Sequence, residues 1–257
     1  MYLGAQVYSI RNQIQTPEGY FSAMVQLKAM GYDTVQHAGA PLGDPYLLRD
    51  LTQQAGLRQV CPNIDAKPLL EDVDKVIADL RILDCDSIML PYITPDDFVT
   101  LSSFQKAWEP LEAPVQKLLD SGITPAYHNH DFDVAPMSDW DGSFVDWLFE
   151  NRPGWQFILD VCWAEYAHTD VCGWFQKLGD RINCVHFKDY TGGMNARHIP
   201  VFCACGKGVV DLPKYAEAVK ACGIEDVIVE QDNALNYPEP MAQMKQSAAA
   251  LEALFGK

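Results

Sequence analysis

The sequence has no run of basic residues and no long hydrophobic segment. Its 19 Lys and Arg residues are scattered among 35 Asp and Glu, which gives a formal net charge of −16. Because a nucleic-acid-binding protein needs a basic surface for the phosphates, we expect no nucleic-acid partner. No apolar run approaches the roughly 20 residues that a membrane helix requires, so we expect no membrane partner either.

The cysteine spacing excludes the common zinc modules. The chain has eight cysteines but no Cys-x-x-Cys pair. Several lie in apolar runs, as Cys61 does after Val60, where cysteine behaves as a small hydrophobic residue. The amino terminus also lacks the basic segment followed by a long apolar segment that marks a signal peptide. We therefore predict reduced thiols and a cytoplasmic location.

No linker rich in Pro, Gly or Ser divides the chain, so we predict a single domain over residues 1–257. Short apolar runs alternate with amphipathic stretches along its whole length. The predicted strands are 2–8, 34–37, 57–63, 87–90, 123–129, 155–160, 182–187 and 226–230. The predicted helices are 16–31, 44–55, 69–83, 94–122 with an interruption near Pro110 and Pro114, 142–151, 171–178, 213–222 and 240–255.

Eight strands that alternate with eight helices in 257 residues are typical of an α/β fold, the (β/α)8 TIM barrel. A doubly wound open sheet is the alternative. That fold usually carries a glycine-rich turn after its first strand, whereas this chain has Ser9-Ile10-Arg11-Asn12 there. The missing glycines favour the barrel.

Residues of the kind that bind metals or move protons stand at the ends of several predicted strands. The fifth strand ends in His128 and His130, which strand alternation places on one face. Asp160, His186 and Glu230 end or nearly end the next three strands. Because the active site of a TIM barrel lies at the carboxyl ends of its strands, these three can converge on one cation. Each also has a structural explanation, as a loop cap, a core histidine or an ion-pair partner.

Four sequence blocks, in this order, resemble a known family. They are Y-H-N-H-D-F, L-D-V-x-W, H-F-K-D and V-E-Q-D, and they follow the opening G-A-Q-V-Y-S-I-R. The set resembles the sugar phosphate isomerase/epimerase family of xylose isomerase-like barrels, including its inosose dehydratase-like branch, from Gly4 to about Leu254. The resemblance implies a TIM barrel that binds a divalent metal. Mn²⁺ is the first expectation, and a mixed N/O ligand set also suits Mg²⁺, Co²⁺ or Zn²⁺.

Carried over by position, the resemblance implies metal ligands at Asp160, His186 and Glu230. Many members of the family add a glutamate from strand five. The matching position here is His128, with Asp133 as a nearby carboxylate that offers an alternative. The identity of the fourth ligand therefore stays open between these two residues.

The implied reaction is abstraction of a proton next to the carbonyl of a keto sugar or related polyol. Glu230 is expected to act as base as well as ligand, and His130 or Lys188 to return the proton or to protonate a departing hydroxyl. Return of the proton to carbon makes the enzyme an isomerase or epimerase, which is our first expectation. Loss of a β-oxygen makes it a lyase, such as a dehydratase or an enzyme that cleaves 3-keto glycosides.

Further side chains near strand ends are candidates for binding a small-molecule carbohydrate substrate. These are Tyr8, Arg11, His37, Asn63 and Trp163. Two other classes of protein are weighed against a sugar enzyme. One is a metal-dependent phosphodiesterase of the endonuclease type, which the acidic charge disfavours, and the other is a non-catalytic sugar-binding barrel. Barrels of this family are often dimers or tetramers, so a homo-oligomer is also consistent with the resemblance.

Overall fold

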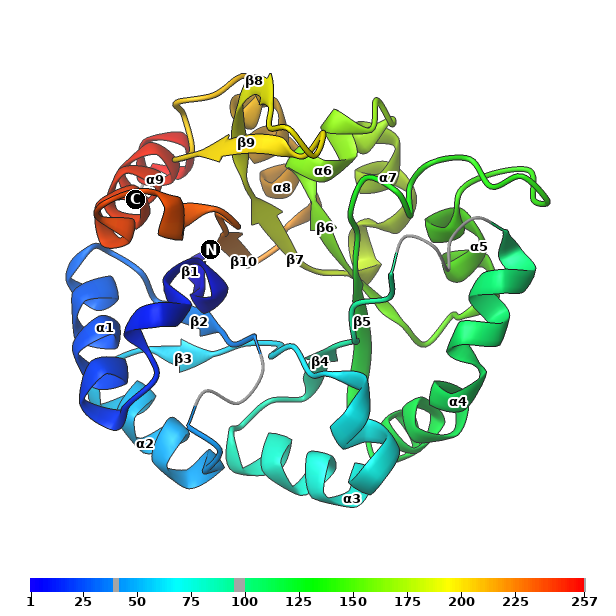
Figure 1. Cartoon of the computed structure of the whole chain (residues 1–257), viewed down its shortest axis with the longest axis horizontal. Coiled ribbons are helices and arrows are strands. Elements are labelled where there is room, and N and C mark those ends of the chain that lie inside the picture. The colour runs from blue at the N-terminus through cyan, green and yellow to red at the C-terminus, as the bar shows by residue number, and fades with distance from the viewer. Residues whose placement is uncertain (39–41, 95–99, 257) are drawn as a thin grey trace.

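The computed structural model describes residues 1–38, 42–94 and 100–256. Eight parallel strands form one curled sheet with helices around its outside (Figure 1). Their order in space is β3-β2-β1-β10-β7-β6-β5-β4. The strands are β1 (Tyr2–Gln6), β2 (Thr34–Gln36), β3 (Arg58–Gln59), β4 (Ser87–Met89), β5 (Thr124–His128), β6 (Gln156–Asp160), β7 (Ile182–Phe187) and β10 (Asp226–Val229).

The two edge strands of this sheet, β3 and β4, are linked through one isolated bridge. Asn63 pairs in parallel with Met89, and the amide of Met89 donates to the carbonyl of Pro62 at 2.9 Å. The expected strand 57–63 is shortened because Cys61 has a φ of +33° and Pro62 has no N–H to continue the ladder. A curled sheet of eight parallel strands fits the predicted TIM barrel, with the β3–β4 ladder reduced to this bridge.

Helices cover the outer side of the sheet, and most lie where the sequence predicts them. They are α1 (Pro17–Ala29), α2 (Pro45–Gln54), α3 (Ala66–Ile82), α4 (Leu101–Asp120), α5 (Phe144–Asn151), α6 (Val161–Tyr166), α7 (Val171–Leu178), α8 (Leu212–Cys222) and α9 (Pro240–Phe255). The short α6 was not predicted. The predicted start of the long helix at 94–95 falls partly outside the described residues.

Local sequence explains where these helices begin and end. The side chain of Thr16 accepts a hydrogen bond from the amide of Gly19, and Pro17 occupies the first turn of α1. Gly31, with a φ of +96°, follows the end of that helix. The interruption predicted near Pro110 and Pro114 is wrong, because α4 runs through both prolines. Burial of its apolar face stabilises this helix by more than the loss of two backbone N–H donors destabilises it.

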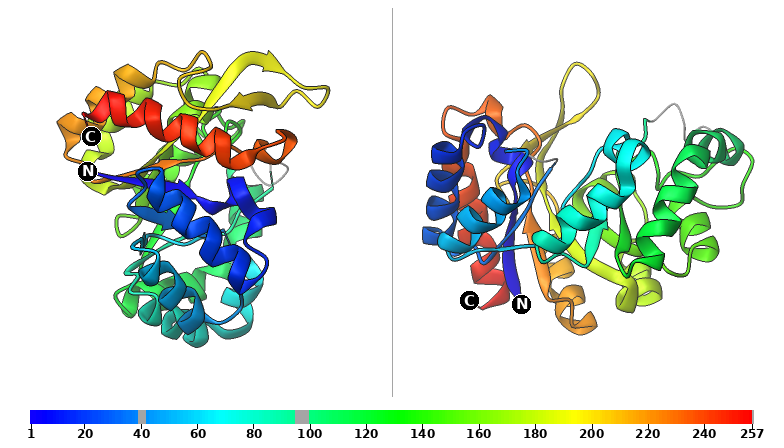
Figure 2. Two further views of the ribbon diagram at one scale, coloured as in Figure 1. Left: turned by 90° about the vertical axis from the view of Figure 1, so that its left-hand side faces the viewer. Right: turned by 90° about the horizontal axis from the view of Figure 1, so that it is seen from below.

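An antiparallel hairpin, which was not predicted, follows β7. It consists of β8 (Asp189–Met194) and β9 (Pro200–Cys203). In Figure 2 it projects at one end of the molecule, and both chain termini lie at the other end. The buried carboxylate of Asp189 holds the base of the hairpin, accepting the amides of Gly206 and Gly208 at 2.9 Å and that of Val210 at 3.1 Å.

The apolar core has two parts. The larger part fills the space between the sheet and the helices. The smaller part fills the interior of the curled sheet and consists of Val60, Cys61, Met89, Ala126, Ile158, Cys184 and Ile228. All eight cysteines are free, as the sequence predicts. Among the described helices, none has the length and apolar character that crossing a membrane requires.

Candidate metal centre

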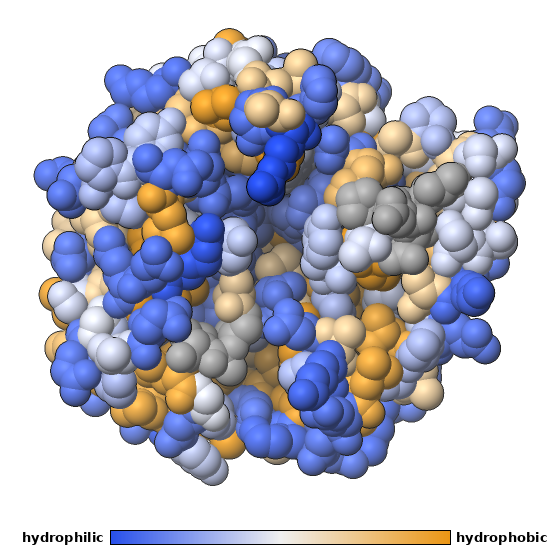
Figure 3. All heavy atoms as spheres, in the orientation of Figure 1, coloured by the Kyte–Doolittle hydropathy of each residue, from blue (hydrophilic) through white to orange (hydrophobic). Residues whose placement is uncertain are grey.

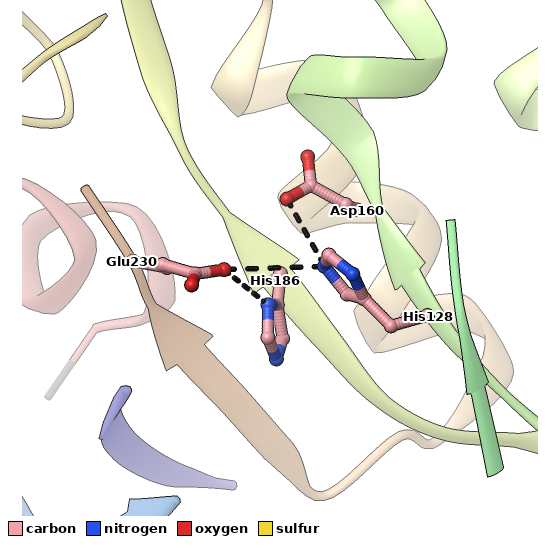
Figure 4. Close-up of side chains that lie close together, drawn as sticks. All are labelled: His128, Asp160, His186 and Glu230. Carbon is pink, nitrogen blue, oxygen red and sulfur yellow. Dashed lines mark hydrogen bonds and ion pairs between the residues drawn. The ribbon is translucent and has the colours of Figure 1, made fainter. Parts of the chain in front are cut away.

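Four side chains converge at the carboxyl ends of four neighbouring strands (Figure 4). His128 ends β5, Asp160 ends β6, His186 lies near the end of β7 and Glu230 directly follows β10. Each offers one nitrogen or oxygen atom, and these four atoms all lie within 4.8 Å of one another. Asp160, His186 and Glu230, which the sequence expects to converge, therefore lie together.

The hydrogen bonds of His186 direct one lone pair toward this cluster. Gln36 donates its amide N–H to the carbonyl of Cys61 at 2.9 Å, which fixes the orientation of the amide. Its amide oxygen, which can only accept, lies 2.6 Å from Nε2 of His186, so that nitrogen carries a proton. In the neutral ring, Nδ1 then presents a lone pair 2.9 Å from Oε2 of Glu230. Two electron-rich atoms this close fit a shared cation.

His128 presents a second lone pair. Burial lowers the pKa of His128 to about 3, so its ring is neutral at pH 7. Its Nε2 lies 3.4 Å from Oδ2 of Asp160 and 3.9 Å from Oε2 of Glu230. Within the described residues, the buried Nε2 of His128 has no hydrogen-bond partner, and the buried Oδ2 of Asp160 lies 3.1 Å from the ammonium of Lys188. A buried nitrogen without a partner is rare in native proteins, and the donor set fits a divalent metal.

Asp160 is held rigidly by its neighbours. Its backbone amide donates to Oδ1 of Asn129 at 2.8 Å, and its own Oδ1 accepts the amide of Trp163 at 2.9 Å, which caps α6. Burial would raise the pKa of Asp160, but the ammonium of Lys188 lowers it to about 2. The carboxylate is therefore ionised, and its second oxygen is directed at the cluster.

Lys188 is a buried ammonium beside the same carboxylates. Its Nζ lies 3.1 Å from Oδ2 of Asp160, 3.1 Å from Oε2 of Glu230 and 3.1 Å from Oδ1 of Asp232. Burial would lower the pKa of Lys188, but the three carboxylates raise it well above its usual value. Burial would likewise raise the pKa of Glu230, but the ammonium of Lys188 holds it well below its usual value. Lysine and glutamate are therefore both charged.

His130 lies past the end of β5, on the open side of the cluster. Its ring centroid lies 4.9 Å from that of His128. Its backbone amide donates to both oxygens of Asp133 at 3.0 Å, and Asp133 also accepts the hydroxyl of Tyr127 at 2.8 Å. Asp133 lies outside the four-residue cluster. Of the two strand-five candidates for the fourth ligand, His128 is the one that lies with the other three residues.

Of the five predicted substrate-binding side chains, Trp163 borders the cluster, and Tyr8 and Arg11 lie on a segment that contacts Asp232. The ring of Trp163 is 5.7 Å from that of His130, and Nζ of Lys188 lies 5.4 Å from the Trp163 centroid. Tyr8 and Arg11 lie in η1 (Val7–Gln13), directly after β1. The guanidinium of Arg11 stacks 3.9 Å from the Tyr8 ring and donates to the carbonyl of Asp232, which joins η1 to the edge of the cluster.

The other two are not brought to the cluster. His37 is fully buried, and its Nε2 lies 2.7 Å from the hydroxyl of Tyr20 in α1. Asn63 donates to the carbonyl of Leu90 and takes part in the bridge between β3 and β4. Strand alternation allows only one of Gln36 and His37 to face the interior of the sheet, and that residue is Gln36. Sequence reasoning assigned no role to Gln36, although this alternation was the signal that identifies it.

Comparison with known proteins shows which solved structures share this fold. Neither a protein-family model nor a curated protein matches the chain. Among solved structures, a sugar phosphate isomerase/epimerase from Parabacteroides distasonis ATCC 8503 superposes with a TM-score of 0.78 at 18% identity, over 98% of this chain and 94% of that one. The IOLI protein with a bound zinc atom gives 0.72 at 14% identity, over 100% and 98%. A probable 3-DHS dehydratase, AsbF from Bacillus anthracis, gives 0.73 at 14% identity, over 98% of each chain.

These identities are low, so the likeness concerns the fold and not the reaction. It extends over nearly the whole chain, as the resemblance of the four sequence blocks did. The resemblance inferred from the sequence is thus confirmed: the chain has the fold of the sugar phosphate isomerase/epimerase and xylose isomerase-like proteins.

Proposed function

We propose that this chain is a divalent-metal-dependent sugar isomerase or epimerase. The observation that carries the proposal is the cluster of two histidines and two carboxylates at the carboxyl ends of β5, β6, β7 and β10. Support also comes from the fold, which is shared with a sugar phosphate isomerase/epimerase and with an L-ribulose 3-epimerase. The substrate would be a small carbohydrate with a carbonyl group.

The metal would be held by His128, Asp160, His186 and Glu230. Two imidazole nitrogens with two carboxylate oxygens suit Mn²⁺ and also Zn²⁺, Co²⁺ or Mg²⁺. The zinc atom in the IOLI protein supports a divalent ion without choosing among these. When bound, such an ion would stabilise the negative charge that develops on substrate oxygens as the neighbouring C–H loses its proton.

Glu230 is the proposed base. Its carboxylate is ionised because the ammonium of Lys188 lies 3.1 Å away. Lys188, whose pKa is raised, would keep its proton and stabilise the developing negative charge through its own positive charge. His130 lies on the exposed side of the cluster and would return the proton to the substrate.

The proposed substrate-binding residues are Tyr8, Arg11 and Trp163. The Trp163 ring borders both His130 and the ammonium of Lys188. Tyr8 and Arg11 present an aromatic face and a guanidinium on the side of β1, next to Asp232. Together these side chains would hold the sugar between β1 and β6.

A lyase is the second candidate, and the likeness to a dehydratase favours it. The fold is shared with a probable 3-DHS dehydratase. In a lyase Glu230 would remove the proton, and the charged form of His130 would protonate the departing oxygen.

Solvent deuterium exchange tests the proposed function. The protein, loaded with Mn²⁺ or Zn²⁺, is incubated in deuterated water with keto sugars, inososes and 3-keto glycosides, and products are followed by NMR and mass spectrometry. An isomerase or epimerase incorporates deuterium at carbon, whereas a lyase releases water or an alcohol. Glu230→Gln should abolish either outcome. If the wild-type protein and Glu230→Gln behave alike on every substrate, the proposal is wrong.

A further inference from the structure

Aromatic rings form a continuous surface that leads away from the metal centre. It consists of His130, Phe132, Tyr92 and Trp163, and we call it the aromatic surface. His130 is at its centre, stacked on Phe132 with centroids 5.3 Å apart and planes inclined by 7°. Tyr92 meets His130 edge-on at 5.0 Å, and Trp163 lies 5.7 Å away on another side.

This surface rises from the buried centre to solvent. The side chains of His186, His128 and His130 are 1%, 9% and 24% exposed, and Tyr92 is 57% exposed. Each ring in this series touches the next, at centroid distances of 4.6, 4.9 and 5.0 Å. A molecule whose reacting end reached the cluster would therefore lie along ring faces on its way out.

The elements that carry these rings all belong to the face formed by the carboxyl ends of the strands. Tyr92 follows β4, His130 and Phe132 follow β5, and Trp163 lies in α6, directly after β6. Figure 3 looks onto this face and shows it hollowed near the centre. The surface thus adjoins the metal centre and remains open to solvent, as a site for a longer molecule requires.

The chemistry of the surface also limits what it binds. Among the described residues, Lys188 is the cation in contact with this surface, and its ammonium is already held by Asp160, Glu230 and Asp232. A phosphate needs donors that are free of carboxylates, so this surface does not suit one. Aromatic faces instead bind flat apolar faces, such as an aryl ring or the C–H face of a second pyranose.

We propose that the aromatic surface is a second binding subsite, which takes a ring attached to the reacting sugar. The substrate is then a glycoside that carries the reacting carbonyl on its sugar ring, with an aryl group or a second sugar as its other part, and not a free monosaccharide or its phosphate. The proposal rests on the proposed function only in naming the reacting part as a sugar. It adds the ring beyond that sugar and assigns it to Tyr92 and its neighbours.

Binding measurements test this subsite without any turnover. We would measure dissociation constants by calorimetry for methyl β-glucoside, phenyl β-glucoside and cellobiose with the wild-type chain, and then with Tyr92→Ala. The matched control is Tyr46→Ala, because Tyr46 is also 57% exposed but lies in α2 and stacks near Arg49. Both tyrosines are exposed enough for alanine to be tolerated.

Ring stacking of this kind changes affinity by roughly three- to ten-fold. The phenyl glycoside, the disaccharide or both should therefore bind tighter than the methyl glycoside by about that factor. Tyr92→Ala should remove the advantage, and Tyr46→Ala should keep it. The phenyl and cellobiose arms distinguish an aryl group from a second sugar. The subsite would be overturned if all three ligands bound with equal affinity, or if neither extended ligand bound at 10 mM, which is roughly the weakest range accessible. It would also be overturned if Tyr92→Ala kept the advantage unchanged.

A failure of the subsite is distinct from a failure of the proposed function. The deuterium experiment reports proton transfer and involves Glu230, whereas the binding experiment reports contact with Tyr92. A protein that exchanges deuterium but shows no preference for extended ligands keeps the proposed function and loses the subsite. The reverse result keeps a glycoside-binding face and removes the isomerase.

Discussion

The ammonium of Lys188 lies 3.1 Å from Oδ2 of Asp160, and both side chains are buried. The same ammonium is equally close to Glu230, so it contacts two of the four groups proposed to hold the metal. Asp232 gives it a third carboxylate, on the outer side. The ammonium of Lys188 therefore lies beside the metal ion that the cluster is proposed to bind. Two positive charges this close repel each other.

Replacement of this lysine should tighten metal binding. In Lys188→Met the repulsion is gone and the carboxylate charge remains, so we expect the dissociation constant for Zn²⁺ or Mn²⁺ to fall by about ten-fold or more. Calorimetric titration of the metal-free protein measures it. Lys177→Met, which removes an exposed lysine paired with Asp146, should leave metal affinity unchanged. Weaker binding by Lys188→Met would show that the ammonium helps to hold the site and does not compete with the metal.

The fourth ligand can be identified by two substitutions on the same segment. His128→Ala removes an atom of the cluster and should weaken metal binding by about ten- to hundred-fold, a loss of the size seen when metal sites lose supporting groups. Asp133→Asn changes a residue outside the cluster and should have a much smaller effect on affinity. The same titration reads out both variants. If Asp133→Asn weakened metal binding more than His128→Ala, the fourth ligand would be Asp133 and not His128.

The buried His37 should make stability depend on pH. Burial lowers its pKa from 6.5 to about 4. Above pH 6.5 the ring is neutral in both the folded and the unfolded chain; as the pH falls from about 6.5 to 4, the unfolded chain takes up the proton first. The free energy of unfolding should therefore fall, by about 3 kcal/mol from this residue. Urea unfolding between pH 4 and 7 measures it, and His37→Gln should flatten the curve. An unchanged slope in that variant contradicts the assignment.

The hairpin base should tolerate no side chain at Gly208. A Cβ there would overlap Oδ1 of Asp189 and the carbonyl of Tyr190, both fixed by the hydrogen bonds around Asp189. We expect Gly208→Ala to lower the free energy of unfolding by about 1–3 kcal/mol. At Gly193, on the same hairpin, the nearest atom to such a Cβ is 3.6 Å away, so Gly193→Ala should change stability by less than about 0.5 kcal/mol. Urea unfolding compares the two, and equal effects would contradict the role of Asp189.

The alternation of strands and helices was readable from the sequence because each element carries its own period and its own caps. Thr16, Pro17 and Gly31 marked one helix, and similar signals marked the others. The convergence of Asp160, His186 and Glu230 was also readable, since parallel strands bring their carboxyl ends to one face. These are local signals combined with one rule of topology.

The features that could not be predicted from the sequence depend on contacts between distant segments. The hairpin exists because Asp189 gathers amides from 206–210, and no periodicity in 189–203 announces it. His37 was grouped with the site because it ends the predicted strand 34–37, yet its ring bonds to Tyr20 in α1. The interruption of α4 was expected from its prolines, but the packing of its apolar face decides its course. Tertiary context settled each of these cases.

The central claim of this account is that His128, Asp160, His186 and Glu230 hold one divalent cation. Elemental analysis of the protein, equilibrated with Zn²⁺ or Mn²⁺ and then desalted, tests it most directly. The account predicts about one metal ion per chain in the wild-type protein. It predicts little or none in a folded Asp160→Asn/His186→Ala variant. A wild-type chain that retains no metal, or a double variant that retains a full equivalent, would contradict it.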